Sequence, residues 1–193
     1  ADCAVRVYSD MGEAIPALPF QAPFVAKVCS AEVLHKTDRG GVMLGLDAKS
    51  LPIAVEELRR LFPGASVLVE EQLRIRGGEL IVGALLDPSL GPAVMLGAGG
   101  IFTELYRDVT FRLAPFDEAE AMRMIGELKI APLFEGFRGF RLPADALSKS
   151  LADVAALVME LGASFEQLDI NPLVFAEDRF VALDAKLVLL PRA

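Results

Sequence analysis

The chain has 193 residues, of which 53% are hydrophobic and 24% are charged, so we expect a packed globule of one sizeable domain or two smaller lobes. A net charge of −8 argues against a nucleic-acid backbone as the main partner, but it leaves room for a nucleotide whose phosphates are neutralised by Mg²⁺ and local cations. No apolar run reaches the roughly 18 residues that cross a bilayer, and Cys3 and Cys29 have no metal-ligand spacing, which together suggest a cytoplasmic protein away from membranes.

The first part of the chain is predicted to hold short strands and one helix. A helical period begins at Ser50, places apolar residues between Ile53 and Phe62 near one face, and ends at Pro63-Gly64. Gly77-Gly78 predicts a turn. Apolar, β-branched runs predict strands at residues 24–29, 41–46, 66–71, 79–86 and 93–96.

The second part is predicted to mix helices with further strands. Residues 117–129 begin with acids and end with a lysine, as the helix dipole favours. Residues 143–161 form a strongly amphipathic helix that stops at Gly162. Strands are predicted at residues 111–113, 165–175 (interrupted at Pro172) and 179–190. The pattern is that of an α+β protein with a small strand-rich lobe followed by a larger mixed lobe.

His35, the only histidine of the chain, lies in the stretch His35-Lys36-Thr37-Asp38, which Gly40-Gly41 follows. A neutral imidazole nitrogen is a good nucleophile for phosphate near pH 7, and Lys36 can hold the charge of that phosphate. From these residues alone, a solvated surface loop without a chemical role remains an open alternative.

Asn171 and Asp184 lie in two consecutive extended segments near the end of the chain. If those segments form neighbouring antiparallel strands, the amide and carboxylate oxygens come side by side, and both are hard donors that suit Mg²⁺ held together with nucleotide phosphates. The alternative is that Asp169 and Asn171 only make turn hydrogen bonds before Pro172.

Several other residues are candidates for binding a nucleotide. Lys27 is a lone cation in an apolar strand, so it must reach solvent or meet an anion. Glu70-Glu71 end a strand, and Glu79 begins one after two glycines. The cluster Gly97–Gly100 can present backbone N–H groups to a phosphate, and Arg112 can clamp one, although a plain turn and a solvated face remain open for these two.

In this order, the segments resemble the ATP-grasp subunit of NDP-forming acyl-CoA synthetases of the ADP-forming acetyl-CoA synthetase type. More distant similarity extends to succinyl-CoA synthetase β subunits. The likeness runs from about residue 20 to residue 190, and the matching stretches read PFVAKVCSAEVLHKTDRGGV, VLVEEQLRIRGGELIVG, GPAVMLGAGGIFTELYRDVTFRLAPF and QLDINPLVFAEDRFVALDAK. The resemblance implies an ATP-grasp fold with a small lobe at residues 1–75, incomplete at its N-terminus, and a large lobe at residues 76–193 with the Mg-nucleotide site.

The resemblance also implies a role for each candidate residue. Lys27 resembles the lysine that touches nucleotide phosphate, and Glu70 and Leu73 occupy the hinge where adenine is read. Glu79 resembles the acid that holds the ribose, and Arg112 sits in a family-like position for nucleotide binding. Asn171 and Asp184 resemble the Mg²⁺ ligands. His35 resembles the histidine that accepts phosphate and relays it between ATP or ADP and an acyl-CoA site.

The implied reaction converts acyl-CoA, phosphate and ADP into acid, CoA and ATP, and needs a CoA-binding half that this sequence lacks. We therefore expect the isolated chain to bind nucleotide without turning over acyl-CoA. The missing initiator Met and abrupt start at Ala1 favour a piece of a longer polypeptide in which that half is fused upstream. Two alternatives remain: a regulatory synthetase-like module of a protein lysine acetyltransferase, and an ATP-grasp carboxylate ligase that does not need His35.

Overall fold

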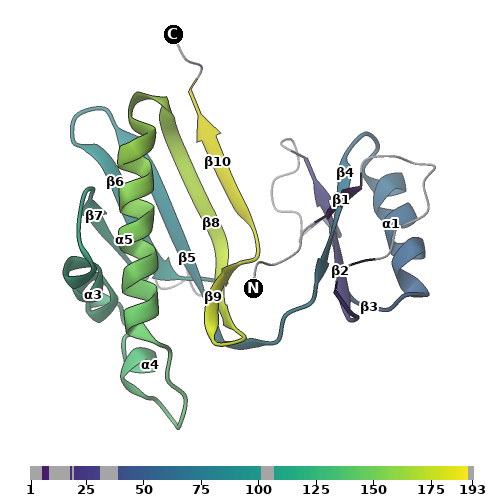
Figure 1. The fold of residues 1–193 in the computed structure, drawn as a ribbon, viewed down its shortest axis with the longest axis horizontal. Helices are drawn as coiled ribbons and strands as arrows, with labels where there is room; N and C mark the ends of the chain where they lie inside the picture. Colours follow the sequence, from purple (N-terminus) through teal and green to yellow (C-terminus); the bar gives the residue numbers. More distant parts are fainter. Residues whose placement is uncertain (1–5, 9–17, 19, 31–38, 101–106, 191–193) are drawn as a thin grey trace. The chain divides into compact units, whose positions relative to one another are not determined.

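The computed structural model describes residues 6–8, 18, 20–30, 39–100 and 107–190. The chain divides into two compact units, Ala1–Leu73 and Arg74–Ala193. Each unit combines an antiparallel sheet with helices on one face, which confirms the predicted α+β class (Figure 1). No helix in the described ranges is long and apolar enough to span a membrane.

The first unit is a four-stranded sheet with one helix. Its strands follow the order β1-β4-β2-β3, and every neighbouring pair is antiparallel. Alternate residues of β2 and β4 face helix α1 and form the core of the unit with it. The elements are β1 (Arg6–Tyr8), β2 (Phe24–Cys29), β3 (Val42–Leu46), α1 (Ser50–Leu61) and β4 (Ser66–Glu71).

The second unit is a six-stranded antiparallel sheet in the order β10-β8-β5-β6-β7, with β9 paired to β8. Helices α3 and α5 lie on the same face of this sheet (Figure 1). Its strands are β5 (Ile75–Asp87), β6 (Gly91–Ala98), β7 (Val109–Leu113), β8 (Phe165–Ala176), β9 (Arg179–Ala182) and β10 (Ala185–Leu189). Its helices are α3 (Glu118–Glu127), α4 (Pro132–Glu135), α5 (Ala144–Leu161) and the 3₁₀ turn η1 (Gly162–Ser164).

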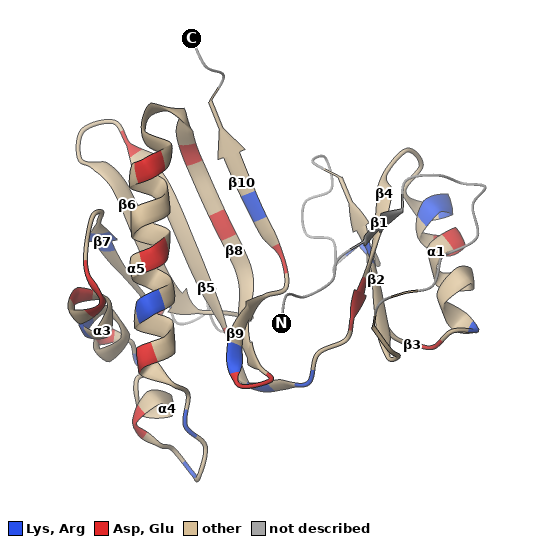
Figure 2. Ribbon diagram, in the orientation of Figure 1, with Lys and Arg blue, Asp and Glu red and all other residues tan. Residues whose placement is uncertain are grey.

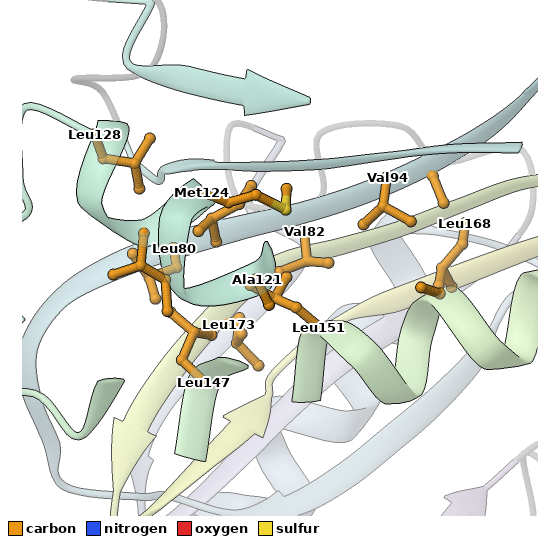
Figure 3. Packing of buried hydrophobic residues seen from close by; sticks show 14 of the residues in the cluster. Leu80, Val82, Val94, Ala121, Met124, Leu128, Leu147, Leu151, Leu168 and Leu173 are labelled. Atoms are coloured by element: carbon orange, nitrogen blue, oxygen red, sulfur yellow. The ribbon is translucent and has the colours of Figure 1, made fainter. Parts of the chain in front are cut away.

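The core of the second unit fills the space between the sheet and its two longer helices (Figure 3). Helix α3 contributes Ala121 and Met124, helix α5 contributes Leu147 and Leu151, and all four side chains are fully buried. The sheet contributes alternate residues of its central strands, among them Leu80, Val82, Val94, Leu96, Leu168 and Leu173. This alternation leaves the intervening residues on the opposite face, which no described helix of this unit covers; we call it the helix-free face.

Several predicted elements differ from the structure, among them the strand predicted at residues 179–190, which is divided into β9 and β10. Helix α3 ends at Glu127 rather than at residue 129, because the backbone N–H groups of Lys129 and Ile130 donate to the Asp108 carboxylate at 2.7 and 3.1 Å. The predicted turn at Gly77-Gly78 is an irregular stretch inside β5, where the register against β8 shifts. Strand β8 continues through Pro172, and the short helix α4 was not predicted.

The packing of α5 gives a test of this core. Leu151→Ala removes a fully buried side chain, and we expect the free energy of unfolding of the second unit to fall by about 2–5 kcal/mol because a cavity remains. Leu157→Ala, at a 40% exposed position of the same helix, is the matched control and should change it much less. Urea unfolding followed by circular dichroism measures both, and equal losses would contradict this packing.

Candidate functional site

Strand β8 has a register offset beside the candidate metal ligands. Ile170 pairs with Val82 of β5, but Leu173 pairs with Leu80, so Asn171 and Pro172 together oppose a single residue. Ile170 and Leu173 both pack toward the core, on either side of this bulge. The two residues between them therefore turn away from the core, as expected where a bulge redirects a strand.

Asn171 of β8 lies opposite Asp184, which belongs to the bend just before β10. The Asn171 N–H donates to the Asp184 carbonyl oxygen at 3.0 Å, and the next pair in the ladder is Ile170 with Ala185. Side chains of directly opposed residues share one face of an antiparallel sheet. The structure thus brings together the two residues that the sequence suggested as Mg²⁺ ligands.

Asp169 and Lys186 form the next pair on this face, two residues along β8 and β10. Burial, and then the nearby charge of Asp184, raise the pKa of Asp169, while Lys186 lowers it. Figure 2 shows acidic positions on β8 and a basic position on β10 in this region. Sequence reasoning treated Asp169 only as a possible turn residue; its spacing of two from Asn171 was the signal that both share a face.

The Asn171 amide oxygen and the Asp184 carboxylate suit Mg²⁺ better than a metal ion whose ligands all come from the protein. No group of three or more His, Cys, Asp or Glu residues suited to a metal occurs within the described ranges. One carboxylate and one amide oxygen match the sparse protein ligation of Mg²⁺, which keeps water molecules and binds substrate phosphates as well. A divalent cation here would also relieve the repulsion between Asp169 and Asp184.

Glu79 lies further along the same face, at the glycine pair Gly99-Gly100. Leu80 points into the core, so Glu79, the residue before it, points to the helix-free face. Its carbonyl oxygen accepts a hydrogen bond from the Gly99 N–H at 2.6 Å. Ile81 is the residue of β5 that lies opposite the bulge. Glu79 is two residues before it, which is roughly 7 Å along the strand.

A shallow hollow of about 210 Å³ continues the helix-free face on the other side of Asp169. Gly83 leaves space in the middle of the sheet there, and Met95 and Phe111 line the hollow from β6 and β7. Asp169 and Gln167 supply its polar edge. Sequence reasoning did not identify this hollow, because its lining comes from four strands.

In the first unit, Lys27 and Glu70 form a closely spaced ion pair on the face of the sheet opposite α1. The Lys27 Nζ lies 2.6 Å from the Glu70 Oε2, and the side chains are only 8% and 15% exposed. Val25 is the residue directly opposite Glu70, so the pair spans a diagonal of the β2–β4 ladder. The lysine in the apolar strand thus meets an anion, which is one of the two outcomes that the sequence left open.

Leu73 is the last residue of the first unit, and hydrogen bonds hold the segment before it. The Gln72 N–H donates to the Pro23 carbonyl oxygen at 2.9 Å, and the Gln72 side-chain oxygen accepts from the Gly45 N–H at 2.6 Å. These contacts fix the direction in which the chain leaves β4. His35 lies outside the described residues.

Arg112 is not placed with the other candidates. It lies opposite Val94, a core residue, and its guanidinium donates to Glu120 of α3 at 2.5 Å and to both oxygens of Glu127. These contacts lie on the helix-covered face, away from Asn171 and Asp184. The two glutamates raise the pKa of Arg112, and the guanidinium lowers the pKa of Glu120 and of Glu127. The structure therefore gives Arg112 a role in fastening α3 to β7.

Comparison with known proteins places these features in a family. A family model described as an ATP-grasp domain matches residues 3–189. The beta subunit of an ADP-forming acetate–CoA ligase (I) of Pyrococcus furiosus is 36% identical over 176 residues, which cover 86% of this chain and 75% of that protein. An ADP-forming acetate–CoA ligase (I) of Archaeoglobus fulgidus is also 36% identical, but this chain covers only 25% of its length.

A solved structure shows the same fold. It is dinucleotide-forming acetyl-coenzyme A synthetase 1 of Ca. Korarchaeum cryptofilum, in complex with coenzyme A and Mg-AMPPCP. In that structure the phosphohistidine segment points towards the nucleotide-binding site. The similarity has a TM-score of 0.77 at 36% identity and covers 88% of this chain and 78% of that one.

The raised pKa of Asp169 predicts a stability that depends on pH. A carboxyl whose pKa is higher in the folded than in the unfolded state destabilises the fold once it is ionised. We therefore expect Asp169→Asn to raise the melting temperature at pH 7 by a few degrees, with a gain that shrinks as the pH falls toward the range where aspartates protonate. Asp178→Asn, at an 89% exposed side chain, is the control. A loss of stability at pH 7 would contradict the repulsion inferred between Asp169 and Asp184.

The Arg112 contacts predict a variant that affects stability without affecting ligand binding. Arg112→Met should lower the melting temperature at pH 7, and the deficit should shrink as acid protonates Glu120 and Glu127, because their lowered pKa values stabilise the fold only above that range. We expect the affinity for Mg-ADP to stay within about twofold, because the Arg112 contacts lie on the opposite face of the sheet from Asn171 and Asp184. A loss of tenfold or more would restore Arg112 as a phosphate clamp.

Proposed function

Because this chain belongs to the ATP-grasp domain family, alongside the beta subunits of ADP-forming acetate–CoA ligases, we propose that it is the nucleotide-binding part of an ADP-forming acyl-CoA synthetase. It binds Mg-ATP or Mg-ADP and transfers phosphate between the nucleotide and a histidine. The transfer is coupled to the interconversion of acyl-CoA and free acid on a CoA-binding half. A cytoplasmic location suits this reaction.

The observation that carries the proposal is the pairing of Asn171 with Asp184 on the helix-free face, with Glu79 roughly 7 Å further along β5. A nucleotide lying along this face can place its ribose at Glu79 and its phosphates at the Asn171–Asp184 pair. The carboxylate of Glu79 accepts hydrogen bonds from ribose hydroxyls. The Asn171 and Asp184 oxygens hold Mg²⁺, which offsets charge on the phosphate oxygens.

The resemblance assigns further nucleotide contacts to residues of the first unit, and we include these assignments in the proposal. The Lys27 ammonium stabilises the phosphoryl group that is transferred, and its ion pair with Glu70 keeps it in place until a phosphate arrives. Glu70 and the backbone of Leu73 contact the adenine. The two units then correspond to the small and large lobes, expected at residues 1–75 and 76–193.

His35 is the proposed phosphate acceptor. An unprotonated imidazole nitrogen attacks the γ-phosphorus of ATP, the bond from phosphorus to the bridging oxygen breaks, and ADP leaves with the electron pair. The reverse step returns the phosphoryl group to ADP. Phosphoryl transfer depends mainly on positioning and electrostatic stabilisation, so the groups named above suffice.

The complete reaction requires a partner. This chain spans 75% of a separate beta subunit but only 25% of a longer ligase, so the CoA-binding half is either a second subunit or another part of one polypeptide. The comparisons give no support to the alternative of a regulatory module of a lysine acetyltransferase. An ATP-grasp carboxylate ligase without a histidine relay remains distinguishable by experiment.

Labelling with γ-³²P-ATP and Mg²⁺ tests the proposal. We expect the wild-type chain to acquire an acid-labile, base-stable phosphate, as phosphohistidine does, and His35→Ala to lose the label completely while binding Mg-ADP within about twofold of wild type. Asp184→Asn should weaken Mg-ADP binding by about tenfold or more, because it removes a charged metal ligand.

Two controls interpret the result. Asp178→Asn changes an exposed carboxylate on the β8–β9 hairpin and should leave labelling and binding unchanged. Undiminished labelling of His35→Ala would exclude the relay, and ATP-dependent ligation by that variant would instead support a carboxylate ligase. Full Mg-ADP affinity in Asp184→Asn would remove the proposed metal site.

A further inference from the structure

Glu79 lies close to the glycine pair Gly99-Gly100 through its backbone and through one oxygen of its carboxylate. We propose that Gly99 and Gly100 are positioning residues for Glu79, and that through it they set the preference of the site for a nucleotide with an intact ribose diol. The inference rests on the proposed function, since it extends the assignment of Glu79 to the ribose.

Gly99 holds the backbone of Glu79. Its N–H donates to the Glu79 carbonyl oxygen at 2.6 Å, at the end of the β5–β6 ladder, where Leu80 pairs with Ala98. A Cβ atom on Gly99 would lie 2.8 Å from the Glu79 carbonyl carbon, 2.9 Å from its oxygen and 3.0 Å from its Cβ. These are backbone atoms and a Cβ, which cannot rotate aside, so a larger residue here must push the strands apart.

Gly100 borders the carboxylate itself. A Cβ atom on Gly100 would lie 3.2 Å from the Glu79 Oε2, and Gly100 has φ +68°, a left-handed conformation that glycine adopts without strain. The absence of a side chain therefore lets the carboxylate rest over the Gly99-Gly100 backbone. A Cβ at position 100 would require the Oε2 atom to shift by a few tenths of an ångström, and it would strain the left-handed turn.

This arrangement matters because Glu79 would otherwise be poorly constrained. Glu79 is exposed, and it follows Gly77 and Gly78, where the register of β5 against β8 is irregular. A long carboxylate side chain in such a place has many rotamers, and ordering it on ligand binding costs conformational entropy. In this proposal the glycine pair favours one of these rotamers before the ligand arrives, and such preorganisation favours binding.

The chemistry of the ligand follows from the carboxylate. A fixed carboxylate presents two acceptor oxygens, which match the two hydroxyl donors of a ribose diol. A nucleotide without those hydroxyls leaves the charged acceptor without its partners, so the site discriminates against it. A displaced or freely rotating carboxylate loses part of this discrimination even though its charge is unchanged.

The test compares the binding of Mg-ADP with that of Mg-2′,3′-dideoxy-ADP by isothermal titration calorimetry. Wild type should prefer Mg-ADP by about tenfold or more, since each hydrogen bond to a charged group contributes about 1.5–3 kcal/mol. Glu79→Gln should reduce that preference to about threefold or less. Gly100→Ala should reduce it in the same way, mainly through weaker Mg-ADP binding, with little change for the dideoxy analogue.

Two further variants separate side-chain contact from backbone strain and from general damage. Gly100→Asn adds a side chain against the Oε2 atom, although asparagine tolerates a left-handed φ better than alanine does, and it should also lose the preference. Gly126→Ala is the matched control: a Cβ there meets no atom within 4 Å, and it should retain the full preference. Gly99→Ala should lose the preference and also lower the melting temperature.

The outcomes distinguish this inference from the proposed function. If Glu79→Gln loses the preference while Gly100→Ala and Gly100→Asn keep it, the positioning role is overturned and the nucleotide site stands. If Glu79→Gln keeps the preference, Glu79 does not read the ribose and the inference falls with that assignment. If wild type binds neither nucleotide, the proposed function fails. Loss of preference in both Gly100 variants, with a folded Gly126→Ala control, supports the inference.

Discussion

The bulge at Asn171-Pro172 lets one strand of the large sheet carry both polar residues and core residues. Without it, the strict alternation of β8 would place Leu173 and Phe175 on the same face as Asn171, the helix-free face. The extra residue restores the core position of Leu173, while Asn171 stays exposed between two buried stretches. One local irregularity thus preserves the packing of the core directly beside the candidate metal ligands.

The two faces of this sheet have separate electrostatic roles. On the helix-covered face, Arg112 joins Glu120 and Glu127 in contacts that stabilise the charged forms of all three. On the helix-free face, burial and the neighbouring Asp184 raise the pKa of Asp169. In the first arrangement each carboxylate is paired with the guanidinium, which strengthens the fold, whereas in the second two carboxylates lie near each other, where a cation is useful. This contrast separates the charged residues that fasten a helix to the sheet from those proposed to bind a metal ion.

Glycines also shape the helix-free face, both beside Glu79 and beside Asp169. Gly99 and Gly100 allow the β5–β6 ladder to close tightly on Glu79, and Gly83 leaves the hollow beside Asp169. In both places the missing side chain creates the shape of the helix-free face. Small residues here are as much a part of the site as the charged residues, because they determine where a carboxylate lies and where a ligand has room.

The sequence by itself determined the α+β class and most strands and helices, because alternation, helical periodicity and turn residues are local signals, and it singled out Asn171 and Asp184 as residues that neighbouring strands would pair. The motifs also identified the family. Tertiary structure decided what depends on distant partners: that Arg112 faces Glu120 and Glu127, that Asp169 shares a face with Asp184, and that Glu79 packs on Gly99-Gly100. Spacing along a chain does not reveal which face of a sheet a helix will cover, so these assignments required the packed fold.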